Sequence, residues 1–179
     1  MTRPTPTPAL LALAALGSLG TGTSAWAAGV QLKLELPRLN VAEYHRPYVA
    51  VWLEKAGEPG PAAAQLAVWY DMKKPNGAGT KWLRDMRQWW RQGGRSLEMP
   101  ADGVSGATRA PGEHVISFDK HPALAQLPAG KYELVIESSR EAGGREVQRL
   151  PLNWPVKAES SVQAQGEHEL GALQLSVKP

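Results

Sequence analysis

The sequence predicts a mostly β protein, an antiparallel β-sandwich with one short amphipathic helix. About seven short segments have strand-like patterns, and turn residues separate them at close intervals. Two of these segments are apolar on both faces, which is typical of central strands covered from two sides. A single segment, residues 81–91, places its apolar side chains at helical spacing.

The expected strands are defined by alternation or by continuous apolar runs. Residues 30–36 alternate between apolar and mostly polar side chains, and Pro37 ends this half-buried strand. Residues 48–53 and 66–70 are continuous apolar strands, and the Pro/Gly/Ala-rich residues 56–64 form the loop of a hairpin between them. Further strands are expected at residues 113–118, 131–137, 145–154 and 169–177.

The predicted helix has one apolar and one basic face. Thr80 is its expected N-cap, and Gly93 and Gly94 are expected to end it. Because so short a helix is unstable alone, its apolar stripe must pack on the sandwich. We expect Trp82, Met86 and Trp89 to make that contact. The stripe also includes Leu83 and Trp90, and the basic face carries Arg84, Arg87 and Arg91.

Residues 1–27 are predicted to be a secretory signal peptide. Arg3 precedes an apolar run over residues 9–19, and Ala25 and Ala27 flank Trp26 in the small-x-small pattern of a cleavage site. The run is shorter than the roughly 20 residues that a membrane-spanning helix needs. We therefore expect cleavage after Ala27 and a single periplasmic domain over residues 28–179, soluble and without a transmembrane segment.

Composition excludes several classes of site. The chain contains no cysteine, which rules out disulfides, thiolate metal sites, iron–sulfur clusters and the C-x-x-C-H haem attachment. Its net charge of +3 is too small to predict a nucleic-acid partner. The four histidines lack metal-ligand spacing, and no G-x-S-x-G, P-loop or dinucleotide-binding fingerprint is present, so neither a metal site nor a catalytic residue is predicted.

The most informative stretch is residues 102–108, which have the pattern D-x-x-S-G-A-T. This pattern resembles the site at which FAD:protein FMN transferases attach FMN to a threonine hydroxyl. The same pattern occurs in the C subunit of the sodium-pumping NADH:quinone reductase and in the G subunit of the Rnf complex. The resemblance implies covalent FMN at Thr108, on an exposed turn without strand or helix pattern. The other residues assigned to this cofactor site are Asp102, Ser105, Gly106, Ala107 and Arg109.

A second group of residues supplies candidate contacts to the flavin. Tryptophans of the helix could stack on the flavin ring, although an aromatic stripe at this spacing is more often core. The arginines could stabilise a reduced, anionic flavin, or form an ordinary solvated helix face. His45 is a candidate because Tyr44 and Arg46 flank it. The candidate contacts are Trp82, Trp90, Arg84, Arg87, Arg91 and His45.

Two further resemblances complete the prediction. Residues 111–137, with P-G-x-H-x-x-x-F-D followed by L-P-A-G-x-Y-x-L-x-I-E, resemble the Ig-like module of flagellar hook-capping proteins. From residue 37 onward the chain resembles an exported bacterial family of unknown function, through residues 44–52, 81–95 and 105–112. Members of that family tend to be encoded beside PepSY-type membrane proteins and FMN transferases.

These resemblances imply an Ig-like sandwich that serves as a flavin-carrying electron carrier rather than an enzyme with its own substrate. Its partners would be an FAD:protein FMN transferase and a PepSY-type membrane reductase. The alternative is a non-enzymatic periplasmic Ig-like module that binds a peptide, a glycan or a partner protein. Fold alone does not separate the two, because sandwiches serve many functions.

Overall fold

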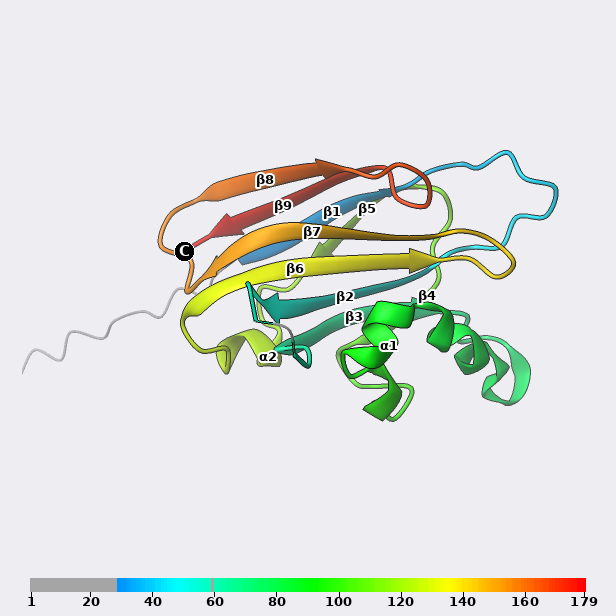
Figure 1. Cartoon of the computed structure of the whole chain (residues 1–179), viewed down its shortest axis with the longest axis horizontal. Helices are drawn as coiled ribbons and strands as arrows, with labels where there is room; N and C mark the ends of the chain where they lie inside the picture. The colour runs from blue at the N-terminus through cyan, green and yellow to red at the C-terminus, as the bar shows by residue number, and fades with distance from the viewer. Residues whose placement is uncertain (1–28, 59) are drawn as a thin grey trace, which may run out of the picture.

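In the computed structural model, which describes residues 29–58 and 60–179, two β-sheets pack face to face and a helical segment covers one of them (Figure 1). The four-stranded sheet has the order β5 (Gly112–Ser117), β1 (Gly29–Leu36), β9 (Ala172–Lys178) and β8 (Ser160–Gln165). The five-stranded sheet has the order β4 (Ser105–Ala107), β3 (Ala64–Tyr70), β2 (Tyr48–Lys55), β6 (Gly130–Ser139) and β7 (Arg145–Trp154). The predicted mostly β sandwich is therefore confirmed.

The sequence patterns of β1 and β2 match their burial: the alternating strand has one buried face, and the continuous apolar strand has two. Even-numbered residues of β1, from Val30 to Leu36, are buried between the two sheets. Strand β2 lies in the middle of its sheet and is buried on both faces. Val49 and Val51 join the core between the sheets, whereas Ala50 and Trp52 join a second core beneath the helical segment. The predicted β2–β3 hairpin is also present.

The helical segment differs from the predicted continuous helix. It consists of a 3₁₀ stretch, η1 (Pro75–Asp85), a short helix, α1 (Arg87–Arg91), and a 3₁₀ turn, η2 (Gly94–Ser96). Thr80 is not an N-cap, because it lies inside η1 and its hydroxyl donates to the Gly77 carbonyl. The expected packing is nevertheless correct: Met86 and Trp89 are fully buried against the five-stranded sheet, and Trp82 packs at the margin of that core.

A buried carboxylate explains why the helix is interrupted at Met86. Glu137 projects from β6 and accepts hydrogen bonds from the backbone N–H groups of Gln88, at 3.2 Å, and Trp89, at 2.6 Å. A continuous helix would direct these two groups to carbonyls four residues earlier. Glu137 instead caps α1 from the sheet, and the negative charge is favourable at a helix N-terminus. The Arg145 guanidinium also pairs with this carboxylate.

Two strands and one helix were not anticipated from the sequence. Strand β8 pairs with β9 at the edge of the four-stranded sheet, and the helix α2 (Pro122–Ala125) follows β5. Strand β4 pairs with β3 in parallel, so the sandwich is not entirely antiparallel. Strand β9 begins at Ala172 rather than at Glu169, because the preceding residues form a turn held by Glu146.

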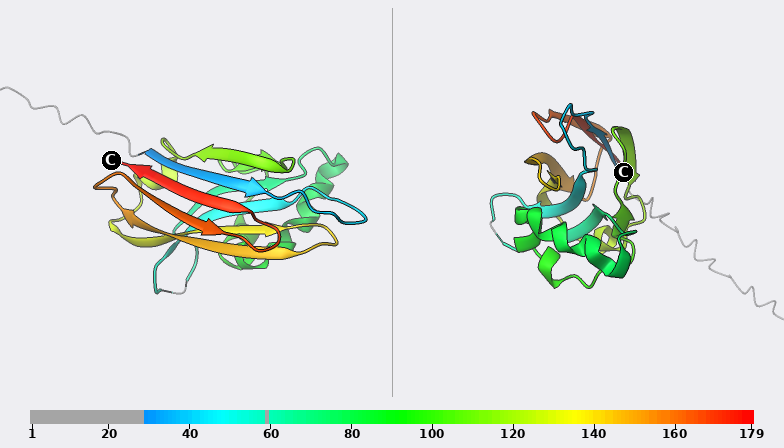
Figure 2. Two further views of the ribbon diagram at one scale, coloured as in Figure 1. Left: turned by 90° about the horizontal axis from the view of Figure 1, so that it is seen from above. Right: turned by 90° about the vertical axis from the view of Figure 1, so that its right-hand side faces the viewer.

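Several loops meet at one end of the sandwich, on the right in Figure 1 and facing the viewer in the right-hand view of Figure 2. They are the β1–β2 loop, the β6–β7 turn and the β8–β9 turn. In the part of the chain that the structure describes, no helix is long and apolar enough to span a membrane. The predicted signal peptide lies outside the described residues.

Candidate functional site

The D-x-x-S-G-A-T segment is more regular than the sequence suggested. Ser105, Gly106 and Ala107 form β4, which pairs in parallel with Val68, Trp69 and Tyr70 of β3. Thr108 is the first residue beyond the strand, and its backbone N–H donates to the Tyr70 carbonyl at 3.1 Å. The expected exposed turn is thus a short edge strand, and Thr108 is fixed at its end rather than on an irregular loop.

A tight turn precedes the strand. The Ser105 hydroxyl accepts a hydrogen bond from the backbone N–H of Ala101 at 2.9 Å, and the Ser105 N–H donates to the Ala101 carbonyl at 2.9 Å. Gly103 has a φ of 71°, which a residue with a side chain rarely adopts. Asp102 is exposed in this turn. Ser105 therefore holds the turn that leads into β4.

Gly106 packs against an aromatic ring. A Cβ atom at this position would lie 3.0 Å from Cδ1 of Trp69, closer than ordinary packing allows. The Arg109 guanidinium lies over the Trp69 ring, 5.3 Å from the ring centroid. The His114 ring meets the Trp69 ring edge-on, with the two centroids 5.8 Å apart. Within the folded chain, the absence of a side chain at Gly106 makes room for the Trp69 ring.

A pocket of about 380 Å³ lies beside Thr108. Its walls come from the β1–β2 loop, from the residues that follow β3 and from the β6–β7 turn, segments distant in sequence. Of the predicted flavin contacts, the pocket includes only His45. Its lining residues are Tyr44, His45, Arg46, Tyr48, Asp71, Met72, Lys73, Lys74, Ala107, Thr108 and Glu141.

The charged groups of this pocket are partly paired. The Lys74 ammonium donates to the Glu141 carboxylate at 3.0 Å, and this hydrogen bond raises the pKa of Lys74. His45 lies 3.2 Å from Glu43 and 3.9 Å from Glu141. Arg46 and Lys73 contribute further positive charge to the pocket wall. The pocket therefore offers cationic groups in the same lining as Thr108.

Two tyrosines give the pocket an aromatic wall. The Tyr48 hydroxyl donates to the Gly79 carbonyl at 2.9 Å, and its ring meets Tyr70 edge-on at 6.4 Å. Burial raises the pKa of Tyr48, and burial likewise raises the pKa of Tyr44, with the Arg140 guanidinium opposing the shift at Tyr44. Both phenols therefore remain neutral at pH 7. Neither tyrosine was a predicted flavin contact, although Tyr44 adjoins the candidate His45.

The remaining predicted flavin contacts lie elsewhere. Arg84, Arg87 and Arg91 are exposed on the helical segment and do not line the Thr108 pocket. Trp90 packs against Trp89, with ring centroids 6.3 Å apart. Trp82 is nearer, because Lys74, which lines the pocket, lies 5.8 Å from the centre of its ring.

A buried ion pair supports the loops around the site. The Arg140 guanidinium donates to both carboxylate oxygens of Glu169, at 2.7 and 2.9 Å, and the Gly144 N–H donates to the same carboxylate. This pair joins the β6–β7 turn to the β8–β9 turn. Because both partners are almost fully buried and hydrogen-bonded, loss of either would leave an unpaired buried charge.

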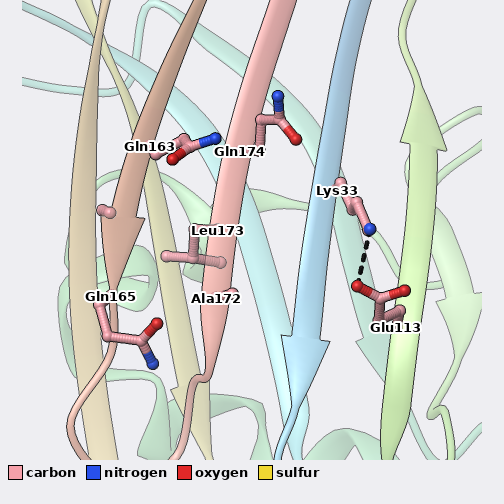
Figure 3. Close-up of a pocket in the computed structure, with 8 residues that line it drawn as sticks. Lys33, Glu113, Gln163, Gln165, Ala172, Leu173 and Gln174 are labelled. Atoms are coloured by element: carbon pink, nitrogen blue, oxygen red, sulfur yellow. Dashed lines mark ion pairs between the residues drawn. The ribbon is translucent and has the colours of Figure 1, made fainter.

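Other hollows lie away from Thr108. One of about 400 Å³, on the four-stranded sheet, is lined by the glutamines Gln163, Gln165 and Gln174 and by a Lys33–Glu113 ion pair (Figure 3). A larger hollow, about 760 Å³, is mostly apolar and lies around Trp154 at the opposite end of β7. Among the described residues, no group of three or more histidine and carboxylate side chains is arranged to hold a metal ion.

Comparisons with known proteins place the chain in a family. No curated protein and no solved structure gives a significant match. A family described as "Predicted periplasmic protein (DUF2271)" matches residues 29–172, which include strands β1 to β8, the first residue of β9 and the Thr108 pocket. The expected periplasmic location is thereby confirmed, and the chain belongs to the DUF2271 family of predicted periplasmic proteins.

Proposed function

We propose that Thr108 carries FMN through a phosphoester and that the protein is a periplasmic electron carrier. The observation that supports this most is that the acceptor motif ends at a pocket. Thr108 completes the D-x-x-S-G-A-T pattern, and it also lines a hollow of about 380 Å³. A plain polar turn would need no such hollow beside its last residue.

The residues of the pocket fit a flavin. Its volume falls within the roughly 300–1,000 Å³ of small-molecule and cofactor sites. Tyr44 and Tyr48 would give apolar contact to the ring, while Arg46, Lys73 and Lys74 would favour the negative charge of the phosphate or of a reduced flavin. When bound, the flavin supplies the redox chemistry, and the chain supplies position and electrostatics.

The attachment transfers a group without oxidation or reduction. The Oγ1 atom of Thr108 forms a bond to the riboflavin-bearing phosphorus of FAD, and the phosphoanhydride bond breaks. AMP leaves with the bonding electrons, and the hydroxyl proton passes to a base of the transferase. The position of Thr108 at the end of β4 favours this reaction, because the backbone that carries the acceptor hydroxyl is already held in place.

A covalent link suits an exported carrier. It prevents loss of the cofactor by diffusion and replaces a dissociation equilibrium with a high local concentration. As the resemblance implies, a PepSY-type membrane reductase would deliver the electrons. The chain would pass them onward without a catalytic residue of its own.

The proposal is tested by following flavin through denaturing electrophoresis. The chain is incubated with an FAD:protein FMN transferase, FAD and Mg²⁺, and the denatured band is examined for flavin fluorescence. We expect a fluorescent band for the wild type and for Thr80→Val, and none for Thr108→Val. Thr80 is a matched control because it is an exposed threonine whose hydroxyl bonds the Gly77 carbonyl. An unlabelled wild type, beside an acceptor that is labelled, would contradict the proposal.

The alternative of a non-enzymatic binding module is favoured by one observation, the apolar hollow of about 760 Å³ around Trp154. Trp154 is partly exposed and could contact a peptide or glycan. This function needs no cofactor, so the purified protein would stay colourless after co-expression with the transferase. Ligand binding abolished by Trp154→Ala in a colourless protein would favour the alternative over the electron carrier.

A further inference from the structure

A second pocket adjoins the one beside Thr108. It has a volume of about 390 Å³ and shares Tyr44 and Arg46 with the first. The other walls are formed by Arg38 and Leu39 from the β1–β2 loop and by Ala110 and Pro111. The chain that follows β4 thus runs past both hollows.

Two guanidinium groups face this second pocket without an acidic partner. Arg38 and Arg46 are exposed, and neither forms an ion pair with any of the described residues. The nearby acids are engaged elsewhere: Glu43 lies against His45, Glu141 against Lys74, and Glu169 against Arg140. The pocket is therefore positively charged and has two planar forks of N–H donors.

Tyr44 adds a neutral donor between the two pockets. Its phenol lies close enough to Arg38, Arg46 and Arg140 for their charges to act on it. Because burial keeps the phenol protonated, its O–H can donate a hydrogen bond to an anion. The apolar side chains of Leu39 and Pro111 limit the space available, which favours a small ligand.

We propose that this pocket binds a small anion with two or more carboxylate groups, held by Arg38 and Arg46. Guanidinium forks match carboxylates in a bidentate manner, and two forks need at least two anionic groups. The binding itself does not depend on attachment at Thr108. The role of the bound anion does rest on the proposed function: if the protein is an electron carrier, the anion in this pocket would belong to the electron acceptor, one pocket away from the flavin.

The test is a calorimetric titration of the unmodified protein with citrate at low salt. We expect one citrate per chain, with affinity that falls as salt is added. Arg38→Gln and Arg46→Gln should each weaken binding about tenfold or more, and the double variant should abolish it. Tyr44→Phe should weaken it less. Arg87→Gln, the same charge change on the exposed helical surface, should leave the affinity unchanged.

Three results would overturn the proposal. Absence of citrate binding in the wild type would remove the site, and equal weakening by Arg87→Gln would reduce it to general surface charge. Binding of pyrophosphate in preference to citrate would exclude a carboxylate ligand. Thermal unfolding of each variant verifies that it is folded. Since unmodified protein is used, a negative result leaves flavin attachment at Thr108 standing, and failure of attachment leaves this binding test intact.

Discussion

Trp89 joins the helical segment to the five-stranded sheet. Its side chain is fully buried among Ala50, Val68 and Val135, and its indole N–H donates to the Gln65 side-chain carbonyl at 2.8 Å. A large buried aromatic with a satisfied polar atom contributes both area and a specific orientation. The tryptophan therefore stabilises the fold and does not serve as a flavin platform.

We predict that Trp89→Ala lowers the free energy of unfolding by about 3–5 kcal/mol, as deletion of a buried aromatic does. Urea denaturation followed by circular dichroism measures the change. Arg87→Ala, two residues away and exposed, is the control and should change stability by less than about 0.5 kcal/mol. A loss below about 1 kcal/mol for Trp89→Ala would contradict the buried position.

At Gly106 we predict that a side chain is not tolerated. A Cβ atom there would press on the Trp69 ring, so Gly106→Val should cost about 1–3 kcal/mol through overpacking. The tryptophan fluorescence should change as the ring is displaced. Ala107→Val, next along β4 but exposed, should leave both stability and fluorescence nearly unchanged. Equal effects of the two substitutions would refute the specific contact with Trp69.

The residues that line the Thr108 pocket could be predicted only where they belong to one motif or are neighbours in sequence. Thr108 could be named from its motif, and His45 from its neighbours Tyr44 and Arg46. Lys74 and Glu141 were missed because they are 67 residues apart and meet only when β3 and the β6–β7 turn reach the same end of the sandwich. No local pattern marks such a pair.

Among the secondary-structure elements, strands whose apolar pattern follows their burial were predictable. Val30 to Leu36 alternates in sequence and in burial, and β2 is apolar on both faces because it is covered on both. Strand β8 was missed because S-S-V-Q-A-Q contains few apolar residues, as an edge strand can. Strand β4 is three residues long, too short for any periodicity.

The helical segment was predictable in its buried face but not in its backbone conformation. The apolar stripe predicted correctly which residues pack on the sheet, because side-chain spacing determines the buried face. The interruption at Met86 was not predictable, since its cause is the carboxylate of Glu137, 49 residues from Gln88. A long-range hydrogen bond overrides local helix propensity here.

A second carboxylate, Glu146, accepts hydrogen bonds from the backbone of the β8–β9 turn. Burial alone would raise its pKa, but hydrogen bonds from the Gln148 side chain and from the backbone N–H groups of Glu167, His168 and Leu170 together lower it to about 2. The carboxylate is more acidic in the folded state than in the unfolded chain. Its stabilising effect is therefore complete above about pH 5 and is lost as the pH falls toward 2.

We predict that Glu146→Gln destabilises the protein by about 3 kcal/mol at pH 7, and that the difference from the wild type shrinks as the pH falls from 5 to 2. Chemical denaturation at a series of pH values measures it. Glu167→Gln, an exposed carboxylate in the same turn, is the matched control and should have little effect at any pH. A difference independent of pH would mean that the carboxylate charge is not responsible.

In the whole molecule, the two ends of the sandwich carry different hollows. The β6–β7 turn and the β1–β2 loop lie at one end of the sandwich (Figure 1), and residues of both line the Thr108 pocket. The apolar hollow around Trp154 lies at the other end of β7. The two sheets lie between these ends, and loops at the ends of a sheet scaffold are where binding sites commonly lie. Under the proposed function, the Thr108 end is the one that would meet the transferase and the redox partners.

The most direct test of flavin attachment at Thr108 is the intact mass of the protein after co-expression with an FAD:protein FMN transferase, followed by peptide mapping. We predict a mass increase equal to FMN less one water, located on the peptide that contains Thr108. Thr108→Ser should keep the adduct because it keeps a hydroxyl, and Thr108→Ala should lose it while remaining folded. An unmodified wild type under conditions that modify a known acceptor, or an adduct that persists in Thr108→Ala, would contradict the account.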